Sequence, residues 1–326
     1  MASPFLNLNH SAAHCSRVES ALRTAVEAKT PYLTEVASHL LLAGGKRVRP
    51  MMAIAAAQVG SDEAVSDDVI RAATACELVH LGSLYHDDVM DSSTTRRGVE
   101  TANSKWGNLQ AVVAGDFLLA RASSLVATLS VEVSRLLAAT IGELCEGQTE
   151  EVSTLFVSSR SLDSYLSSIR GKTASLFAAS ARLGALTAGH DDVVCDTVSR
   201  LAEAYGMVFQ IVDDVLDVMA DGSELGKPAG HDMRAGVYTL PVLLALANPE
   251  GDSGELYDLL SRPLDSPSAA RALAIVRSGP GVASALAFAY RFVTTAEELG
   301  ATLPPSRASE ALSRAPRMLL ESSPSR

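Results

Sequence analysis

The fold is decided by a stretch at residues 78–91 that reads LVHLGSLYHDDVMD, an apolar pattern of helical period that ends in three aspartates. Residues 205–217 read YGMVFQIVDDVLD and repeat this arrangement. On a helix, side chains four residues apart share a face, so the first and last aspartates of each stretch should lie side by side. Such carboxylates repel each other, and an apolar setting strengthens the repulsion. We therefore expect a cation between them. Oxygen ligands of this kind suit Mg²⁺, which completes its shell with water and substrate phosphates.

Two other acidic pairs serve as a comparison. Asp67-Asp68 and Asp191-Asp192 follow turns that contain Ser or Gly, and we interpret them as N-terminal caps of helices. Capping or surface decoration is the ordinary explanation for one such pair. The aspartate-rich stretches differ, because each lies in the body or C-terminal part of an apolar helix and the pattern Asp-Asp-Val-hydrophobic-Asp occurs twice. We name them the first aspartate motif (Asp87, Asp88, Asp91) and the second aspartate motif (Asp213, Asp214, Asp217).

Nearly every other segment also has the helical period, and no run alternates long enough to predict a strand. The helical patterns cover residues 21–42, 68–90, 108–130, 134–151, 162–186, 192–218, 238–246, 268–277, 281–299 and 308–315. No linker composition and no tandem repeat divides the chain. The sequence therefore predicts an all-α fold of about ten or more packed helices in a single domain over residues 1–326, with frayed ends at about 1–9 and 322–326.

Composition excludes several classes of function. The formal net charge of −11 argues against a nucleic-acid surface, which needs clustered Lys and Arg. Asp116 and Arg121 interrupt the apolar stretch at 111–126, so no transmembrane segment is expected. The first residues have neither the basic nor the apolar region of a secretory signal. The scattered cysteines suggest buried free thiols in a reducing cytoplasm: Cys15, Cys76, Cys145 and Cys195.

The aspartate motifs belong to a longer series of short blocks. In chain order these are GGKRVRP at 44–50, ELVH at 77–80, HDDVMD at 86–91, RRG at 96–98, WGN at 106–108, AGD at 114–116, GKT at 171–173, QIVDDVLD at 210–217 and LGKP at 225–228. With these blocks the chain resembles the trans-isoprenyl diphosphate synthase (polyprenyl synthetase) family over nearly its whole length. The resemblance implies an orthogonal helical bundle of the isoprenoid synthase type around a central cavity.

The resemblance also implies an activity. The chain would be a cytoplasmic, homodimeric trans-prenyltransferase that joins isopentenyl diphosphate head to tail (1′-4) to an allylic prenyl diphosphate. About three Mg²⁺ ions per site would assist ionisation of the allylic diphosphate. Both aspartate motifs would hold the metal, with Asp87, Asp88, Asp91 and Asp213 taking part in catalysis. Arg96, Lys172 and Lys227 would contact the allylic diphosphate, and Thr173 and Gln210 would lie near the reacting carbons.

A separate pocket, free of metal, would bind the diphosphate of isopentenyl diphosphate. By resemblance it is formed by Lys46, Arg49, His80 and Arg97. Arginine suits such a pocket, because its planar fork bonds two phosphate oxygens at once. Taken alone, each basic run is better explained by a solvated turn, and His80 or Gln210 by an ordinary helix residue. One position departs from the family pattern: Val237 stands where the family commonly has a lysine, and Arg234 is a possible substitute.

The growing tail would run down along the helix of the first aspartate motif. One helical turn rises about 5.4 Å, close to the length of an isoprene unit. Short-chain members commonly have a bulky aromatic residue one turn before this motif, where this chain has Gly82 and Ser83. The absence of Phe or Tyr there predicts an open tunnel and a long product of roughly six or more isoprene units.

Two other functions stay open from the sequence. A class I terpene cyclase also ionises a prenyl diphosphate with an aspartate–magnesium cluster, but it does not need the second, metal-free diphosphate pocket. A non-catalytic subunit of a heteromeric prenyl synthase would tend to lose its aspartate motifs, and this chain keeps both. A requirement for isopentenyl diphosphate, and activity of the purified chain alone, distinguish the three.

Overall fold

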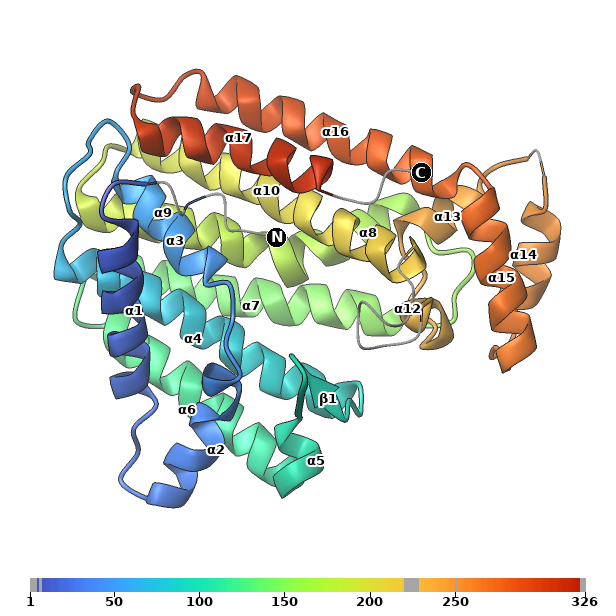
Figure 1. The fold of residues 1–326 in the computed structure, drawn as a ribbon, viewed down its shortest axis with the longest axis horizontal. Helices are drawn as coiled ribbons and strands as arrows, with labels where there is room; N and C mark the ends of the chain where they lie inside the picture. Colours follow the sequence, from blue (N-terminus) through green and yellow to red (C-terminus); the bar gives the residue numbers. More distant parts are fainter. Residues whose placement is uncertain (1–4, 6–7, 220–228, 250, 323–326) are drawn as a thin grey trace. The chain divides into compact units, whose positions relative to one another are not determined.

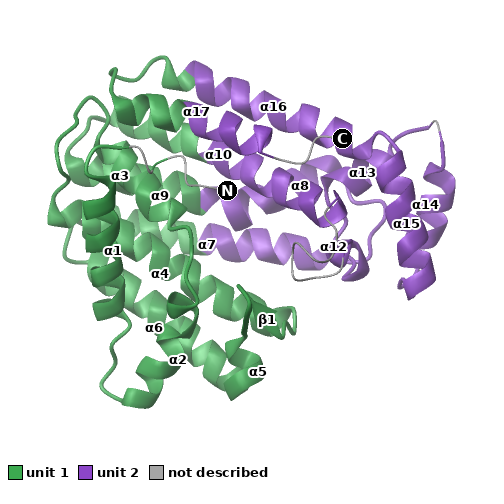
Figure 2. Ribbon diagram, in the orientation of Figure 1, with its two compact units in different colours: residues 1–141, 176–202, 299–313 green, residues 142–175, 203–298, 314–326 purple. Residues whose placement is uncertain are grey.

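The structure, a computed structural model, describes residues 5, 8–219, 229–249 and 251–322 (Figure 1). Helices account for nearly all of its regular structure, so the predicted all-α class is confirmed. The described residues fall into two compact units, coloured separately in Figure 2. Unit 1 comprises residues 1–141, 176–202 and 299–313, and unit 2 comprises 142–175, 203–298 and 314–326. Most of the predicted frayed ends, like Lys227, lie outside the described residues.

Unit 1 is organised around α4 (Asp67–Met90), the helix of the first aspartate motif. Its other elements are α1 (Ser11–Ala25), α2 (Pro31–Leu42), α3 (Val48–Ala57), β1 (Thr95–Arg96), β2 (Val99–Glu100), α5 (Ala102–Trp106), α6 (Asn108–Val126) and α9 (Ser175–Ala188). Helices α1, α3 and α6 pack against α4. Gly82 of α4 meets α6 closely, because a Cβ on it would lie 3.0 Å from the carbonyl oxygen of Gly115. The small residues at this crossing allow the two helices to approach.

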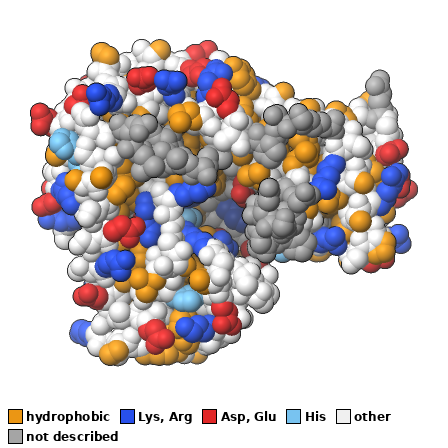
Figure 3. All heavy atoms as spheres, in the orientation of Figure 1, with side chains coloured by type: hydrophobic (Ala, Val, Ile, Leu, Met, Phe, Trp, Pro, Cys, Tyr) orange, Lys and Arg blue, Asp and Glu red, His pale blue; other side chains and the backbone are white. Residues whose placement is uncertain are grey.

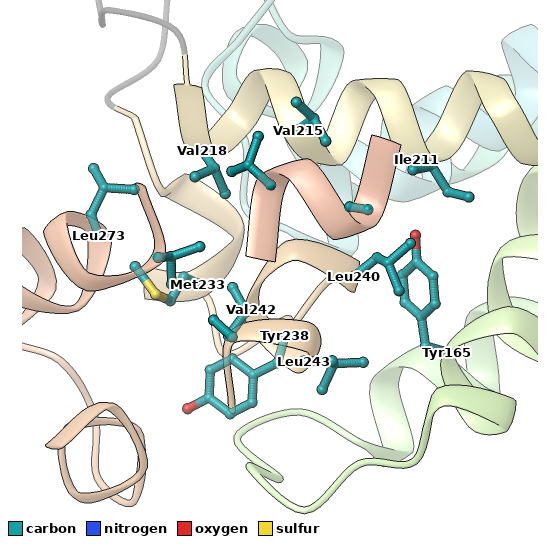
Figure 4. Packing of buried hydrophobic residues seen from close by; sticks show 14 of the residues in the cluster. Tyr165, Ile211, Val215, Val218, Met233, Tyr238, Leu240, Val242, Leu243 and Leu273 are labelled. Carbon is teal, nitrogen blue, oxygen red and sulfur yellow. The ribbon is translucent and has the colours of Figure 1, made fainter. Parts of the chain in front are cut away.

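Unit 2 contains α8 (Leu162–Ile169), the π-helical turn η1 (Arg170–Ala174), α12 (His231–Arg234), α13 (Leu240–Leu246), α14 (Ser253–Leu260) and α15 (Ser266–Ser278). Five of the described helices contribute residues to both units: α9, through Ser175 alone, and α7 (Val131–Ser153), α10 (Asp192–Met219), α16 (Gly281–Gly300) and α17 (Arg307–Glu321). Within unit 2, the α10 side chains Ile211, Val215 and Val218 pack with Tyr165, Leu240 and their neighbours in one buried cluster (Figure 4). Each such aliphatic side chain stabilises the fold by roughly 1.5–3 kcal/mol.

Three local expectations were wrong. Residues 21–42 form two helices, α1 and α2, because Pro31 can begin a helix but disfavours helical dihedrals in the residue before it. Helix α3 was not predicted, because it is buried on nearly every side and therefore has no polar face to give a period. Strands β1 and β2 were not predicted, because two residues cannot show an alternation. Helix α10 is capped by Asp191, as expected, but the cap of α4 is Ser66, whose hydroxyl accepts from the Val69 N–H at 3.4 Å.

The structure allows the expectations about surface charge, membrane helices and cysteines to be compared with the described residues. On the face seen in Figure 3, acidic side chains are interspersed among the basic ones. Helix α6 is long and apolar enough to cross a membrane, and α15 with α16 would qualify as a pair bent by 57°, but core helices of soluble proteins pass the same test. All four cysteines are free thiols. The expectation that all are buried was wrong, because Cys145 is exposed and Cys15 is only partly buried.

Candidate active site

The first aspartate motif lies at the C-terminal end of α4. The buried stripe of this helix runs through Leu78, Leu81 and Tyr85 to Asp88, so Asp88 continues the core face, whereas Asp87 is half-buried and Asp91 exposed. Helix α4 ends at Met90, and Asp91 keeps helical dihedrals as its C-cap. The two outer aspartates are therefore one turn apart, as the spacing predicts.

The chain then reverses in a Schellman motif. Ser92 has a left-handed φ of 50°. The N–H of Ser93 donates to the carbonyl of Asp88 at 2.9 Å, and the N–H of Ser92 donates to that of Val89 at 3.3 Å. The hairpin of β1 and β2 follows, with positive φ at both turn residues, Arg97 (52°) and Gly98 (78°), as a type I′ turn requires. These local bonds bring the Arg96-Arg97-Gly98 block back beside α4.

Arg96 and Asp88 form an ion pair that binds the hairpin to the helix. The Arg96 Nε donates to Asp88 Oδ1 at 2.6 Å, and the side chains are 24% and 1% exposed. A buried carboxylate needs such a partner, because an unpaired charge in the interior is costly. The structure thus brings together two residues predicted for the site, Asp88 and Arg96, through direct contact.

Arg97 points to the loop that contains the GGKRVRP block. Its Nη1 donates to the carbonyl of Leu40 at 3.3 Å and to that of Gly44. Two glycines make this possible. Gly44 has a φ of +90°, and a Cβ on Gly45 would lie 2.6 Å from Arg47 Nη1 and 3.1 Å from Arg97 Nη1. The Gly-Gly pair therefore leaves room for two guanidinium groups.

His80 lies two turns before the first aspartate motif, and the charges of four arginines affect its pKa. Burial, followed by the charges of Arg49, Arg97, Arg96 and Arg47, lowers the pKa of His80 well below its usual range. Arg49 also stacks over the Phe177 ring, 4.2 Å from its centroid. Three of the four residues predicted for the metal-free diphosphate pocket, Arg49, His80 and Arg97, are thus near one another in unit 1.

The second aspartate motif lies on α10 in unit 2. The core stripe of α10 includes Ile211 and Val215, and Asp213 is turned by about 200° from Ile211, which places it on the opposite, exposed face. Asp214 borders the core stripe and is 2% exposed. Its two oxygens accept hydrogen bonds from the Tyr165 hydroxyl at 2.5 Å and from Gln210 Nε2 at 2.9 Å. Burial raises the pKa of Asp214 to about 7, although both bonds lower it.

Gln210 continues this network toward η1. The Thr173 hydroxyl donates to Gln210 Oε1 at 2.8 Å, so the amide of Gln210 is fixed at both ends. Thr173 and Gln210 were predicted to lie together near the reacting carbons, and they are in direct contact. Their position relative to those carbons stays a prediction.

Asp217, the last residue of the second aspartate motif, binds the start of α12. Its carboxylate accepts from the backbone N–H of His231 at 3.1 Å and of Asp232 at 3.2 Å. Burial of its carboxyl group and the charge of Asp217 raise the pKa of Asp232 well above its usual range. Sequence reasoning missed Asp232, because a lone aspartate in a short turn carries no spacing signal. It also missed Tyr165.

Lys172 belongs to η1, where the helix widens by one residue, a feature frequent at functional sites. The turn packs against α7 through two glycines: a Cβ on Gly147 would lie 2.2 Å from the backbone N of Lys172, and one on Gly171 would lie 2.9 Å from Gly147 Cα. Lys172 Nζ is 2.5 Å from Glu151 Oε1, one turn after Gly147. Glu151 was also missed, because its relation to Lys172 depends on this crossing.

Three predicted positions remain. Lys46 is exposed beside the glycine loop, and Arg234 lies in α12, two residues from Asp232. Ser83 is half-buried and its hydroxyl donates to the carbonyl of His80 at 2.9 Å. Among the described residues, no group of three or more His, Cys, Asp or Glu side chains is arranged to hold a metal by itself. Magnesium does not need such a group, since it takes one or two carboxylates together with water and substrate phosphates.

Proteins of known family resemble this chain in sequence. The family model for polyprenyl synthetase matches residues 30–275. The chain is 39% identical over 290 residues to nonaprenyl diphosphate synthase of Mycobacterium tuberculosis, which covers 89% of this chain and 86% of the relative. It is 40% identical over 256 residues to heptaprenyl diphosphate synthase component 2 of Geobacillus stearothermophilus, covering 75% and 79% of the two chains.

Solved structures of prenyl synthases also resemble this chain. A polyprenyl synthase from Caulobacter crescentus, complexed with calcium and isoprenyl diphosphate, superposes with a TM-score of 0.91 at 31% identity and covers 98% of each chain. Heptaprenyl diphosphate synthase from Staphylococcus aureus gives a TM-score of 0.90 at 30% identity, covering 96% of this chain and 98% of that one. The chain therefore belongs to the polyprenyl synthetase family.

Proposed function

We propose that this chain lengthens an allylic prenyl diphosphate with isopentenyl diphosphate, head to tail, to give a long all-trans polyprenyl diphosphate. As a member of its family the chain is a trans-prenyltransferase. One observation carries the proposal: Arg96 pairs with Asp88 of the first aspartate motif, and the next residue, Arg97, donates to the carbonyl of Gly44 in the basic loop. A cationic pocket beside a carboxylate pair suits two diphosphates, of which one binds through metal and the other without it.

The carboxylates fit a magnesium site. Asp87 and Asp91 are the more exposed members of the first aspartate motif, and Asp213 is that of the second. We propose that each motif binds Mg²⁺ through these carboxylates, with about three ions in all, as the family resemblance implies. The buried members, Asp88 and Asp214, would orient the motifs through Arg96 and Tyr165. Bound Mg²⁺ would neutralise the leaving diphosphate and so assist ionisation. Removal of magnesium with EDTA should abolish turnover, and added Mg²⁺ should restore it.

The other predicted site residues would bind the two diphosphates or stabilise the allylic cation. Lys172 and Arg96 would bind oxygens of the allylic diphosphate, with Lys227 as a third cation. The amide of Gln210, fixed by Thr173, presents a neutral dipole that stabilises an allylic cation without reacting with it. Lys46, Arg49, His80 and Arg97 would bind isopentenyl diphosphate, whose double bond attacks the cation.

We propose a long product, because Gly82 and Ser83 leave no aromatic floor one turn before the first aspartate motif. The relatives named as nonaprenyl and heptaprenyl synthases support this length class. Ser83 is the position at which to test it, since a side chain on Gly82 would meet α6. Ser83→Phe should shorten the products while the melting temperature stays near that of the wild type. An unchanged product distribution would place the floor elsewhere.

We propose that one domain over residues 1–326 acts as a cytoplasmic homodimer. The family match spans both compact units, which supports a single domain. Helix α6 presents the apolar side chains Leu109 (72% exposed), Val112 and Val113, which suit the α6 of a second copy. Leu109→Asp should convert a dimer into a monomer in light scattering after size-exclusion chromatography. A wild-type monomer would exclude this assembly.

The function is tested by incubating the purified chain with Mg²⁺, isopentenyl diphosphate and allylic primers of increasing length, followed by mass analysis. Products that grow by isoprene units are expected. Turnover of the allylic diphosphate without isopentenyl diphosphate would indicate a terpene cyclase. A chain that is inert alone but active with a partner would indicate a subunit of a heteromeric synthase, a form suggested by the name of the relative called component 2.

A further inference from the structure

Glu77 is an acidic side chain among the cations of the isopentenyl diphosphate pocket. It lies on α4, one turn before His80, and its side chain is 3% exposed. A substrate diphosphate would be repelled by a carboxylate that it could touch. Glu77 is therefore expected to influence the pocket through the protein side chains that it contacts and not through the substrate.

The partner of Glu77 is Arg47, the second of the three basic residues at 46–49. Arg47 Nη1 donates to Glu77 Oε1 at 3.0 Å, its Nε donates to Glu19 Oε1 at 2.6 Å, and its Nη2 donates to the carbonyl of Leu41 at 3.2 Å. Each nitrogen of the guanidinium thus binds a group of the protein, and the side chain is only 8% exposed. Arg47 therefore differs from exposed Lys46, because it is directed inward and joins α1, α2 and α4.

The backbone at Arg47 is part of this arrangement. Its φ of 49° is left-handed, a conformation that costs a bulky residue free energy unless its surroundings hold it. Lys46 and Arg49 lie one residue before and two residues after Arg47, and both are expected to bind diphosphate. The direction in which their side chains leave the loop depends on the conformation of Arg47, and Glu19 and Glu77 hold that conformation.

The negative charge of Glu77 also reduces the repulsion among the arginines of the pocket. Four arginines lie near enough to His80 to lower its pKa, so they also repel one another. Burial lowers the pKa of Arg97 and works against the charge of Arg47, whereas the negative charge of Glu77 raises the pKa of both and so opposes this repulsion. A buried anion behind the pocket keeps the cations assembled before substrate binds, without occupying the substrate's place.

We propose that Arg47 and Glu77 are a positioning pair for the isopentenyl diphosphate pocket: they contact no substrate, and they hold the basic loop and its charges in the binding arrangement. This inference rests on the proposed function.

A charge-balanced double variant tests the pair. Arg47→Met with Glu77→Leu removes one charge of each sign and fills the space with apolar groups, a replacement that buried ion pairs often tolerate without loss of stability. We expect the Kd for isopentenyl diphosphate, measured by calorimetry in EDTA, and its KM in turnover to rise about tenfold, which is about 1.4 kcal/mol. The KM for the allylic primer should change less than twofold.

A matched control is the exposed pair of Asp68 and Arg71 on the same helix. Asp68→Asn with Arg71→Gln also removes one charge of each sign and should leave both KM values at those of the wild type. Arg47→Lys is the second test, because it keeps the charge and the fold but gives up the forked set of bonds. It should raise the Kd for isopentenyl diphosphate severalfold.

The outcomes separate the two proposals. If the wild type condenses isopentenyl diphosphate and both Arg47 variants bind it with wild-type Kd, the pair is only structural and the inference is wrong. If the double variant does not fold, the Kd of Arg47→Lys decides alone. If the wild type binds isopentenyl diphosphate in EDTA but does not condense it, the proposed function is wrong, and the variants still test the inference through the Kd.

Discussion

Asp87 and Asp88 are neighbours in the chain, yet their surroundings assign them different tasks. Asp87 is half-buried on the face that it shares with Asp91, whereas Asp88 is 1% exposed and paired with Arg96. Asp87→Ala should relieve repulsion and leave the melting temperature unchanged or higher, while turnover falls by about 100-fold or more. Asp88→Ala should lower the free energy of unfolding by about 1–3 kcal/mol, because Arg96 loses its partner. Circular dichroism melting and turnover of both variants check this, and equal loss of stability would contradict it.

His80 gives a pH dependence whose sign follows from its surroundings. Burial and the nearby arginines lower its pKa in the folded protein, whereas in the unfolded chain it titrates near about 6.5. Below that pH the unfolded state binds more protons at this site, so the contribution of His80 to stability is fully present above about pH 6.5 and falls as the pH decreases, by up to about 1.4 kcal/mol per pH unit. His80→Gln should reduce this slope in melting experiments. His14, whose pKa burial also lowers, adds to this slope, whereas Asp214 and Asp232 oppose it, because burial raises the pKa of both carboxyl groups. An unchanged slope would mean that His80 is protonated in the folded protein.

Among the elements, the crossing of α7 and η1 depends on a glycine. A Cβ on Gly147 would lie 2.2 Å from the backbone N of Lys172, whereas one on Gly142, in the same helix, would meet nothing within 4 Å. Gly147→Ala should therefore cost about 1–3 kcal/mol of stability and displace Lys172, with a loss of turnover. Gly142→Ala is the control and should stabilise α7 by up to about 1 kcal/mol. Similar melting temperatures for the two variants would show that η1 can move away from the added methyl group without a loss of stability.

The same elements show what the sequence could predict. Long helices such as α4 and α10 were predicted nearly to their ends, because their buried stripes repeat over several turns. The β1–β2 hairpin and η1 were missed, since a two-residue strand and a single widened turn leave no period to detect. Their formation depends on tertiary contacts, among them the ion pair of Arg96 with Asp88.

Site residues follow a similar rule. The aspartate motifs and basic blocks were found because repetition and family resemblance mark them. Glu77, Glu151 and Tyr165 act through partners that lie 30, 21 and 49 residues away in the chain. No local pattern reveals such pairs. The carboxylates of Asp88 and Asp214 were both expected to hold metal, and their burial on core stripes became visible only in the fold.

At the scale of the whole molecule, the thiols report on folding. Cys145 is exposed, whereas burial raises the pKa of Cys76 to about 12 and also raises that of Cys195. Because the thiolate is the reactive form, iodoacetamide should modify Cys145 within minutes and reach Cys76 and Cys195 only when the protein unfolds. Mass spectrometry of the modified peptides checks this order, and Cys145→Ser should remove the fast phase. Early modification of Cys76 would indicate that unit 1 opens readily.

The type I′ hairpin has a consequence for how the chain can evolve. Arg96 turns to Asp88 and Arg97 turns to Leu40, although a single peptide link joins them. Their Cα atoms are therefore held about 3.8 Å apart by covalent geometry. Selection can exchange the two side chains, but the separation of the points where they leave the chain is set by the backbone. An insertion or deletion in this turn would disturb the contacts of both arginines at once. Selection should therefore remove changes of length here more often than substitutions.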